Sequence, residues 1–324
     1  ALLAGAGLGL VAPDAAGWLE RLVWPSLALL LYATFAQVRP ADALAAFRHR
    51  RFLMASIVAN FLVVPGIVWS LGWLLPPDPA VRLGVFLVLL VPCTDWFIAF
   101  TRMGRGDTRL AIAVVPLQLL VQFATLPLFL WLFMGQEFVN AVSAGPFLQA
   151  FLGLIVLPFG LAALTRHWAN RYPNRRKTNE ASGDSAPRNR PWGARWLHIT
   201  ASLPVPLLAF TLFLIAASQV TALGEVAPSL GWAALVFVLY LAVAMPLARI
   251  IAAAFRLTPP AGRTLAFNLG TRNSFVMLPL ALALPAGWEA TVAVVVLQSL
   301  VELVGVIAYV WLVPKRLFPT GAGT

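Results

Sequence analysis

The sequence is poor in charge: only 11% of its 324 residues are Asp, Glu, Lys or Arg, whereas 60% are hydrophobic. A soluble globular domain carries about 25% charged residues, so this chain cannot cover itself with a water-compatible surface. Its apolar residues come in runs of roughly 17–25, the length at which a helix crosses a bilayer. The composition therefore excludes an ordinary soluble protein and indicates an all-α membrane protein.

Cysteine and histidine are also scarce. Cys93 is the single cysteine, so no intramolecular disulfide can form. The three histidines, His49, His167 and His198, fall at or in basic segments, and no His/Glu ligand motif occurs. We therefore expect no structural metal and no cofactor. An intramembrane enzyme is disfavoured because it needs a nucleophile with its base, or a metal cluster.

The net charge of +11 reflects where the basic residues lie. Apolar spans are expected near 1–12, 22–38, 52–75, 83–101, 110–134, 146–165, 197–220, 230–255, 264–284 and 291–313. Lys and Arg concentrate in every second connection, as the positive-inside rule requires of cytoplasmic loops. This predicts about ten spans in a bacterial inner membrane with both termini cytoplasmic, lipid as surroundings and no nucleic-acid partner. Residues 1–12 fit the remainder of a truncated first helix.

An internal repeat organises these spans. Residues 110–133 align without a gap with 290–313, so that 117–122 (LQLLVQ) fall on 297–302 (LQSLVE) and Trp131 falls on Trp311. We predict a first five-helix repeat over 1–140, a sixth helix at 141–165, a basic cytoplasmic linker at 166–196, completion of the second repeat over 197–314, and a cytoplasmic tail at 315–324. Because five is odd, the second half is inverted, which is typical of secondary transporters and disfavours a channel.

The fourth and ninth spans are interrupted by polar residues at matching positions, 91–95 (VPCTD) and 268–274 (NLGTRNS). Pro92 removes a backbone donor, and Gly270 permits an open backbone. Such matched breaks are the best sequence pointer to a transport site. Residues suited to cap the second half-helices follow each break: Thr94, Asp95, Asn273 and Ser274.

Charge at the breaks predicts the kind of ligand. Half-helix N-termini carry the positive end of the helix dipole, and Arg272 adds a full charge, so an anion or oxyanion is expected there. Asp95 is expected to pair with Arg272 when the site is empty, and the pair could also be purely structural.

Two further polar pairs occupy the fifth and tenth spans at a four-residue spacing. They are Gln118 with Gln122 and Gln298 with Glu302, each pair on one helix face. Glu302 is the one carboxylate in the apolar part of the second half. It is either a proton carrier or a protonated group that hydrogen-bonds between helices.

These residues resemble the bile acid:sodium symporter superfamily. The resemblance is carried by Pro-Cys-Thr at 92–94, Arg-Gly-Asp at 105–107, Arg-Asn-Ser-Phe at 272–275 and Leu-Val-Glu at 300–302. Within it, the arsenite/antimonite efflux permeases are the most similar branch. The resemblance implies a core domain with crossing broken helices 4 and 9 and a supporting panel domain. It also places that branch's functional cysteine on Cys93 and its glutamate on Glu302.

The chemistry of this branch suits a single thiol. Trivalent arsenic and antimony favour thiolate ligands, and Cys93 alone would make one transient bond, with oxygen ligands from Thr94 or Asn273. The sequence departs from sodium-coupled members, which carry a glutamate and a glutamine where Asn268 and Arg272 stand here. It also departs from the efflux branch, whose helix-9 glutamate falls on Val276.

Two hypotheses follow. The chain is either an arsenite/antimonite efflux permease driven by protons rather than Na⁺, or a sodium- or proton-coupled transporter of a small organic anion held by Arg272.

Overall fold

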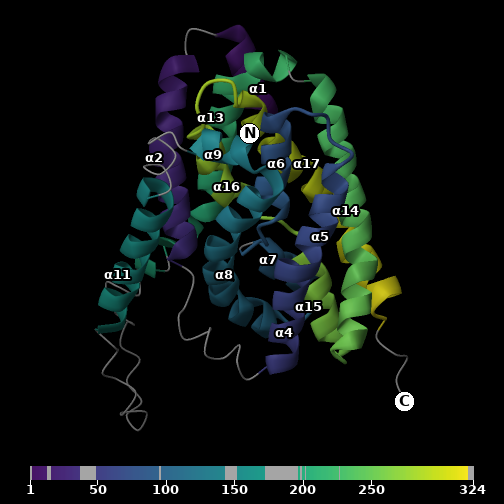
Figure 1. The fold of residues 1–324 in the computed structure, drawn as a ribbon. Coiled ribbons are helices and arrows are strands. Elements are labelled where there is room, and N and C mark those ends of the chain that lie inside the picture. Colours follow the sequence, from purple (N-terminus) through teal and green to yellow (C-terminus); the bar gives the residue numbers. More distant parts are fainter. Residues whose placement is uncertain are drawn as a thin grey trace, which may run out of the picture. The chain divides into compact units, whose positions relative to one another are not determined.

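In this computed structural model, every regular element among the described residues is a helix, which confirms the all-α class (Figure 1). The structure describes residues 2–12, 16–36, 49–94, 96–142, 152–171, 196–197, 199–200, 202–225 and 227–319. Four segments within these ranges are long and apolar enough to cross a membrane: Arg50–Gly72, Thr108–Met134, Ser229–Ala254 and Glu289–Leu317. The count of about ten spans stays a prediction.

The chain divides into two compact units, and each is built from two separated segments. The smaller comprises Ala1–Val38 and Gln149–Thr221, and the larger Arg39–Leu148 and Ala222–Thr324. Each unit takes residues from both predicted repeats, so units and repeats divide the chain differently. The repeat boundaries and the 166–196 linker stay predictions, and residues 172–195 of that linker lie outside the described residues.

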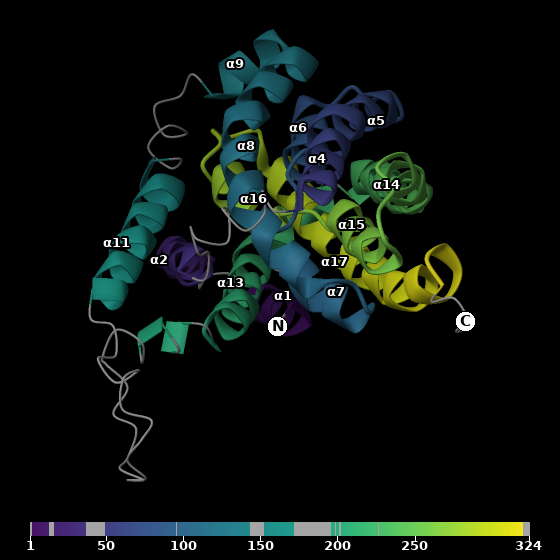
Figure 2. The same cartoon turned by 90° about the horizontal axis from the view of Figure 1, so that it is seen from below.

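The smaller unit contains α1 (Leu2–Val11), α2 (Ala16–Phe35), η4 (Leu152–Val156), α11 (Leu157–Arg171) and most of α13 (Pro204–Glu225). Figure 2 shows α2 beside α11, against which it packs. Hydroxyl groups join its helices: Ser26 Oγ lies 2.6 Å from Thr211 Oγ1, and Tyr32 Oη lies 2.9 Å from Thr165 Oγ1. No site residue predicted from the sequence belongs to this unit.

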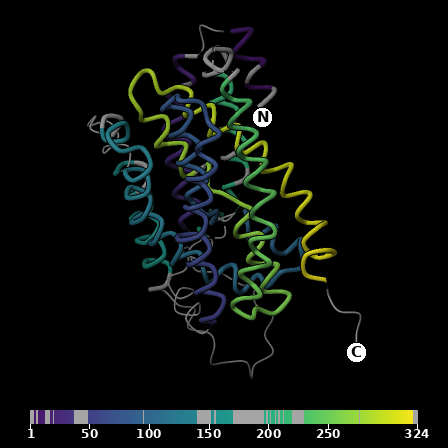
Figure 3. Tube along the Cα trace, turned by 45° about the vertical axis from the view of Figure 1, so that its right-hand side comes forward, coloured from purple at the N-terminus to yellow at the C-terminus, as the bar shows by residue number. Residues whose placement is uncertain are grey.

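The larger unit is built around long helices. The first runs through α4 (Arg50–Val58), a π-helical turn η3 (Ala59–Val63) and α5 (Val64–Gly72). The others are α8 (Thr108–Met134), followed by the short α9 (Gln136–Val142), then α14 (Ala227–Ala254) and α17 (Glu289–Leu312), which continues into the π-helical turn η5 (Val313–Leu317). Helix α17 packs against α14, and Figure 3 shows these two (green and yellow) as neighbouring tubes.

Two spans of this unit are interrupted, where the sequence predicts breaks. One consists of α6 (Pro79–Leu89) and α7 (Trp96–Met103), and the other of α15 (Pro259–Gly270) and α16 (Ser274–Leu282). Asp78 starts α6 because its side chain accepts from Ala80 N at 2.9 Å, with Pro79 at the first helical position. Asp107 caps α8 similarly, accepting from Arg109 N at 2.9 Å. In Figure 2, α4 and α15 lie side by side, in agreement with their packing.

The C-terminal segment is anchored on α15 by Arg263. Its Nε and Nη2 atoms donate to Phe318 O at 2.9 and 2.7 Å, and Nη1 donates to Arg105 O at 3.1 Å. The expected span at 264–284 leaves Arg263 in the preceding connection, but the residue lies within α15 and its side chain is only 2% exposed. It is buried because three backbone carbonyl contacts replace water around the guanidinium.

Candidate functional site

The two breaks meet through their backbones. Pro92 and Arg272 form an antiparallel bridge, in which Cys93 N donates to Thr271 O at 3.2 Å and Asn273 N donates to Val91 O at 3.0 Å. Open backbone inside a membrane protein needs such partners because no water is present to satisfy it. Pro92 and Gly270 therefore interrupt the helices where each break can satisfy the other.

Close approach at this junction depends on Gly270. A Cβ atom added there would collide with the ring of Tyr309 on α17. Glycine thus serves two needs at once, since it ends α15 and lets α17 pack directly on the break.

Cys93 and its neighbours are buried in the junction. Cys93 is 4% exposed and Thr94 2% exposed. Asn273 Nδ2 donates to Thr94 Oγ1 at 3.1 Å, while Asn273 Oδ1 accepts from Val276 N at 3.3 Å and caps α16. Asn273 therefore caps its half-helix as predicted.

The capping role predicted for Ser274 is wrong, because this residue is the first within α16 rather than the cap. Its hydroxyl donates instead to Gln298 Oε1 on α17. Asp95 lies outside the described residues, so its predicted capping role and its predicted pairing with Arg272 stay untested.

Glu302 binds the junction directly. Its Oε2 atom accepts from the backbone N of Arg272 at 2.7 Å and from Gln298 Nε2 at 2.6 Å. The four-residue spacing on α17 thus brings Gln298 and Glu302 together on one face, and Ser274 extends the chain of hydrogen bonds. The junction's only described carboxylate is held by Gln298 of α17 and by the break between α15 and α16.

The guanidinium of Arg272 is buried but incompletely paired. It is 2% exposed, Nη2 donates to Leu269 O at 2.7 Å, and its carbon lies 5.0 Å from the centre of the Tyr240 ring. Nε and Nη1 have no hydrogen-bond partner among the described residues. A buried guanidinium has five donors, so two open donor groups mark a place where an anionic ligand would be stabilised.

A second polar cluster surrounds Asn268 on α15. Asn268 Oδ1 accepts from Ser56 Oγ at 2.9 Å, Asn60 Nδ2 at 2.7 Å and Gln118 Nε2 at 2.9 Å, and Asn268 Nδ2 donates to Gln118 Oε1 at 3.0 Å. Asn60 lies within the π-helical turn η3, a distortion often found at functional sites. The cluster joins α4, η3, α8 and α15 without any charged group.

Gln122 differs from its predicted partner Gln118. It is 1% exposed, and neither its Oε1 nor its Nε2 has a hydrogen-bond partner among the described residues. Four-residue spacing thus put the two glutamines on one face, but only Gln118 reaches the cluster around Asn268.

Sequence reasoning missed four residues that contact the predicted site: Ser56, Asn60, Tyr240 and Tyr309. Asn60 carried a usable signal, because a lone amide inside an apolar span is costly and usually has a partner. The tyrosines carried none, since aromatic residues are common throughout the apolar spans.

The arrangement offers a thiol, a carboxylate, a guanidinium and several amides inside an apolar unit. It does not offer a conventional metal centre, because no group of three or more His, Cys, Asp or Glu residues gathers within the described ranges. Binding and release of a small polar solute fit these groups better than bond-breaking catalysis, which needs an activated nucleophile or metal.

Comparison with known proteins agrees with this picture. Residues 24–251, more than half of the chain, match the model of the Sodium Bile acid symporter family. A segment of 109 residues is 25% identical to the arsenical-resistance protein Acr3 of Corynebacterium glutamicum and covers 33% of this chain. That segment spans 30% of Acr3. The members of the matched family are transporters, not enzymes. This chain is therefore an integral membrane protein that belongs to the sodium bile acid symporter family.

Proposed function

We propose that this transporter exports arsenite or antimonite and is driven by the proton gradient. One observation carries the proposal: the backbone of the single cysteine and the buried carboxylate of Glu302 bind consecutive residues of one break. The backbone N of Cys93 donates to Thr271 O at 3.2 Å, and Glu302 accepts from the backbone N of Arg272 at 2.7 Å. The likeness to an arsenical-resistance protein supports the same substrate class.

The metalloid step would need only one thiol. The Cys93 thiol replaces one hydroxyl of arsenous acid. An As–S bond forms, an As–O bond and the S–H bond break, and the thiol proton leaves with that hydroxyl as water. No oxidation state changes. The remaining hydroxyls would face Thr94 and Asn273, whose side chains already bond to each other at 3.1 Å. A single sulfur ligand binds weakly compared with a cage of three, which favours release.

Proton coupling would use Glu302. Both of its hydrogen bonds end on Oε2, and no donor to Oε1 is present among the described residues. Oε1 is then the oxygen that takes up and loses the proton. Oε2 accepts from Arg272 N and Gln298. A change in the protonation of Glu302 would therefore change the strength of these two hydrogen bonds at the junction.

We infer a ten-span topology with two inverted five-helix repeats, in a bacterial inner membrane with cytoplasmic termini. The alternating basic loops support this inference. The larger compact unit would be the core with the crossing breaks, and the smaller unit the panel. Reporter fusions after each predicted span would test the inference, and two successive fusions on the same side would contradict it.

Efflux is tested in an arsenite-sensitive bacterial strain that lacks its own exporters. The intact chain should lower intracellular arsenic, and everted vesicles should accumulate arsenite only with a proton gradient. Cys93→Ser and Glu302→Gln should each abolish accumulation. Glu289→Gln is the matched control, because it makes the same change on an exposed residue at the start of α17. Accumulation that survives Cys93→Ser would refute the thiol step.

A second candidate, transport of a small organic anion such as a carboxylate, is favoured by Arg272. Its buried Nε and Nη1 atoms have no partner among the described residues, and a carboxylate would accept a charge-assisted hydrogen bond from either of them. Uptake of labelled carboxylates by proteoliposomes, with either a sodium or a proton gradient, tests this candidate. Uptake that is lost in Arg272→Gln while arsenite is not moved would select it over efflux.

A further inference from the structure

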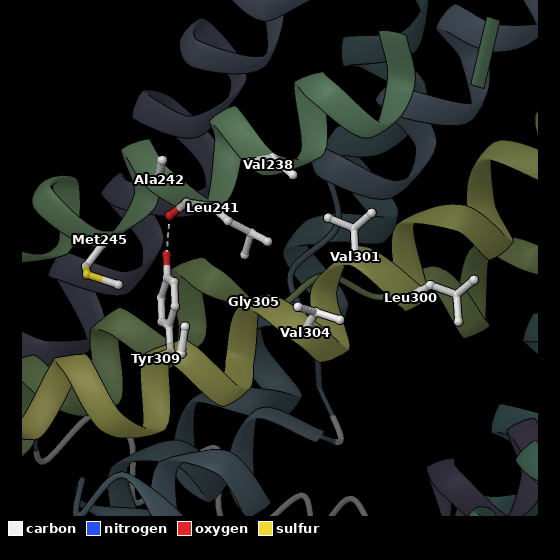
Figure 4. Close-up of a pocket in the computed structure, with 10 residues that line it drawn as sticks. Val238, Leu241, Ala242, Met245, Leu300, Val301, Val304, Gly305 and Tyr309 are labelled. Carbon is white, nitrogen blue, oxygen red and sulfur yellow. Dashed lines mark hydrogen bonds between the residues drawn. The ribbon is translucent and has the colours of Figure 1, made fainter. Parts of the chain in front are cut away.

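An apolar groove lies between α14 and α17 of the larger unit (Figure 4). It has a volume of about 540 Å³, and its walls include Val238, Ala242 and Met245 from α14 and Val304 and Gly305 from α17. The one polar side chain of the lining, Tyr309, donates to Leu241 O at 2.6 Å, as the dashed line in Figure 4 shows. The groove therefore offers its occupant only apolar contacts.

Basic side chains stand at one end of this groove. Val238, Ala242, Met245 and Arg249 follow at spacings of three and four residues, so Arg249 continues the stripe of α14 that lines the groove. In η5, which continues α17, the Lys315 Nζ atom lies 4.8 Å from the ring centre of Trp311, four residues earlier. Both cations are exposed.

Arg249 is held in place where the two helices end. It donates to Leu317 O, and its guanidinium carbon lies 5.5 Å from the ring centre of Phe318. Because Arg263 fixes Phe318 in turn, the basic end of the groove is part of the folded unit rather than a loose tail.

The length of the groove indicates what fits it. From Val238 to Arg249 the helix advances eleven residues, or about 16 Å at 1.5 Å each. Half of the hydrocarbon core of a bilayer is about 15 Å. The apolar groove and the cations thus match one leaflet, with the cations at the level of the headgroups.

We propose that this groove is a binding site for an anionic phospholipid, with one acyl chain between α14 and α17 and its phosphate at Arg249 and Lys315. Basic residues at the membrane surface attract anionic headgroups, and an apolar groove above them accepts the chain. A second copy of this protein fits less well, because a two-fold axis along the membrane normal would bring the same cations of both copies together.

The test compares phosphatidylglycerol with phosphatidylcholine carrying the same acyl chains, bound to the purified full chain and measured by native mass spectrometry. The intact protein should prefer phosphatidylglycerol. Removing one charge should weaken its binding about fivefold, the equivalent of about 1 kcal/mol per basic residue, and removing both about 25-fold. Arg249→Gln, Lys315→Gln and the double variant measure this. Arg109→Gln, also on an exposed arginine, is the control and should change nothing.

The groove itself is tested by Ala242→Phe, which should weaken binding of both lipids by filling the apolar walls. Its control is Gly66→Leu in another apolar groove of about 390 Å³ between α5 and α8, where a side chain at Gly66 meets no atom within 4 Å. Equal binding of the two lipids to the intact protein would overturn the proposal. The proposal would also be overturned if Ala242→Phe changed the oligomeric state of the protein and left lipid binding unaltered. If Ala242→Phe fails to fold, Lys315→Gln on its exposed side chain still decides the charge requirement.

Discussion

Replacing Asn268 by leucine should destabilise the larger unit, because four interhelical hydrogen bonds end on this side chain. They connect Asn268 with Ser56, Asn60 and, twice, Gln118. Interhelical hydrogen bonds in a membrane protein contribute about 0.6 kcal/mol each on average, so the expected loss is about 2.4 kcal/mol. Leucine keeps the approximate volume, which separates the hydrogen-bond effect from a cavity effect.

The matched control is Gln122→Met. Gln122 is as deeply buried, one helical turn from Gln118, but its amide has no partner among the described residues. Removing an unsatisfied buried polar group is neutral or stabilising, so this variant should unfold at the same or a higher denaturant concentration.

Reversible unfolding by titration with sodium dodecyl sulfate, followed by circular dichroism, measures both variants. A double-mutant cycle of Asn268→Leu with Gln118→Leu should show a coupling of about 1.2 kcal/mol from the two bonds that join these residues. Equal losses for Asn268→Leu and Gln122→Met, or a coupling near zero, would show that burial rather than hydrogen bonding holds these helices together.

Two further predictions concern the packing of the larger unit. Gly270→Ala should cost about 1–3 kcal/mol in the same titration, because the new Cβ collides with Tyr309, whereas Gly66→Ala, with open space around its Cβ, should cost nothing. Arg263→Lys replaces a planar fork by a single ammonium and loses at least one charged hydrogen bond to Phe318 O, worth about 1.5 kcal/mol. The Phe318 amide should then exchange its hydrogen about tenfold faster in solvent deuterium, and an unchanged rate would mean that other contacts hold the segment.

Much of the backbone of the site follows from the sequence. Proline, glycine and polar residues inside two apolar runs predict the breaks at 91–95 and 268–274, because these residues cannot continue a helix without help. The four-residue spacing of Gln298 and Glu302 likewise predicts a shared face, and the two side chains are indeed bonded. These features are local, so residue type and spacing are sufficient.

Side-chain partners do not follow in the same way. Gln118 and Gln122 have the same spacing as Gln298 and Glu302, but which of them reaches Asn268 depends on where α15 lies. The sequence does not reveal that Arg263 is buried, because its two carbonyl partners, Phe318 O and Arg105 O, come from residues far away in the sequence. Neither local propensity nor periodicity contains this information, since it arises only when distant segments pack.

The junction of the two breaks is made by main-chain groups. The groups that hold the junction together are therefore different from the side chains that would select a substrate. Cys93 and Asn273 contribute their N–H groups to the pairing, with Thr271 and Val91 as acceptors. Their side chains take no part in this backbone pairing. Any residue except proline can supply such an N–H group, so substitutions at positions 93 and 273 change what the junction contacts without dissolving it. A transporter built this way can acquire a new substrate by exchanging side chains on a retained main-chain frame.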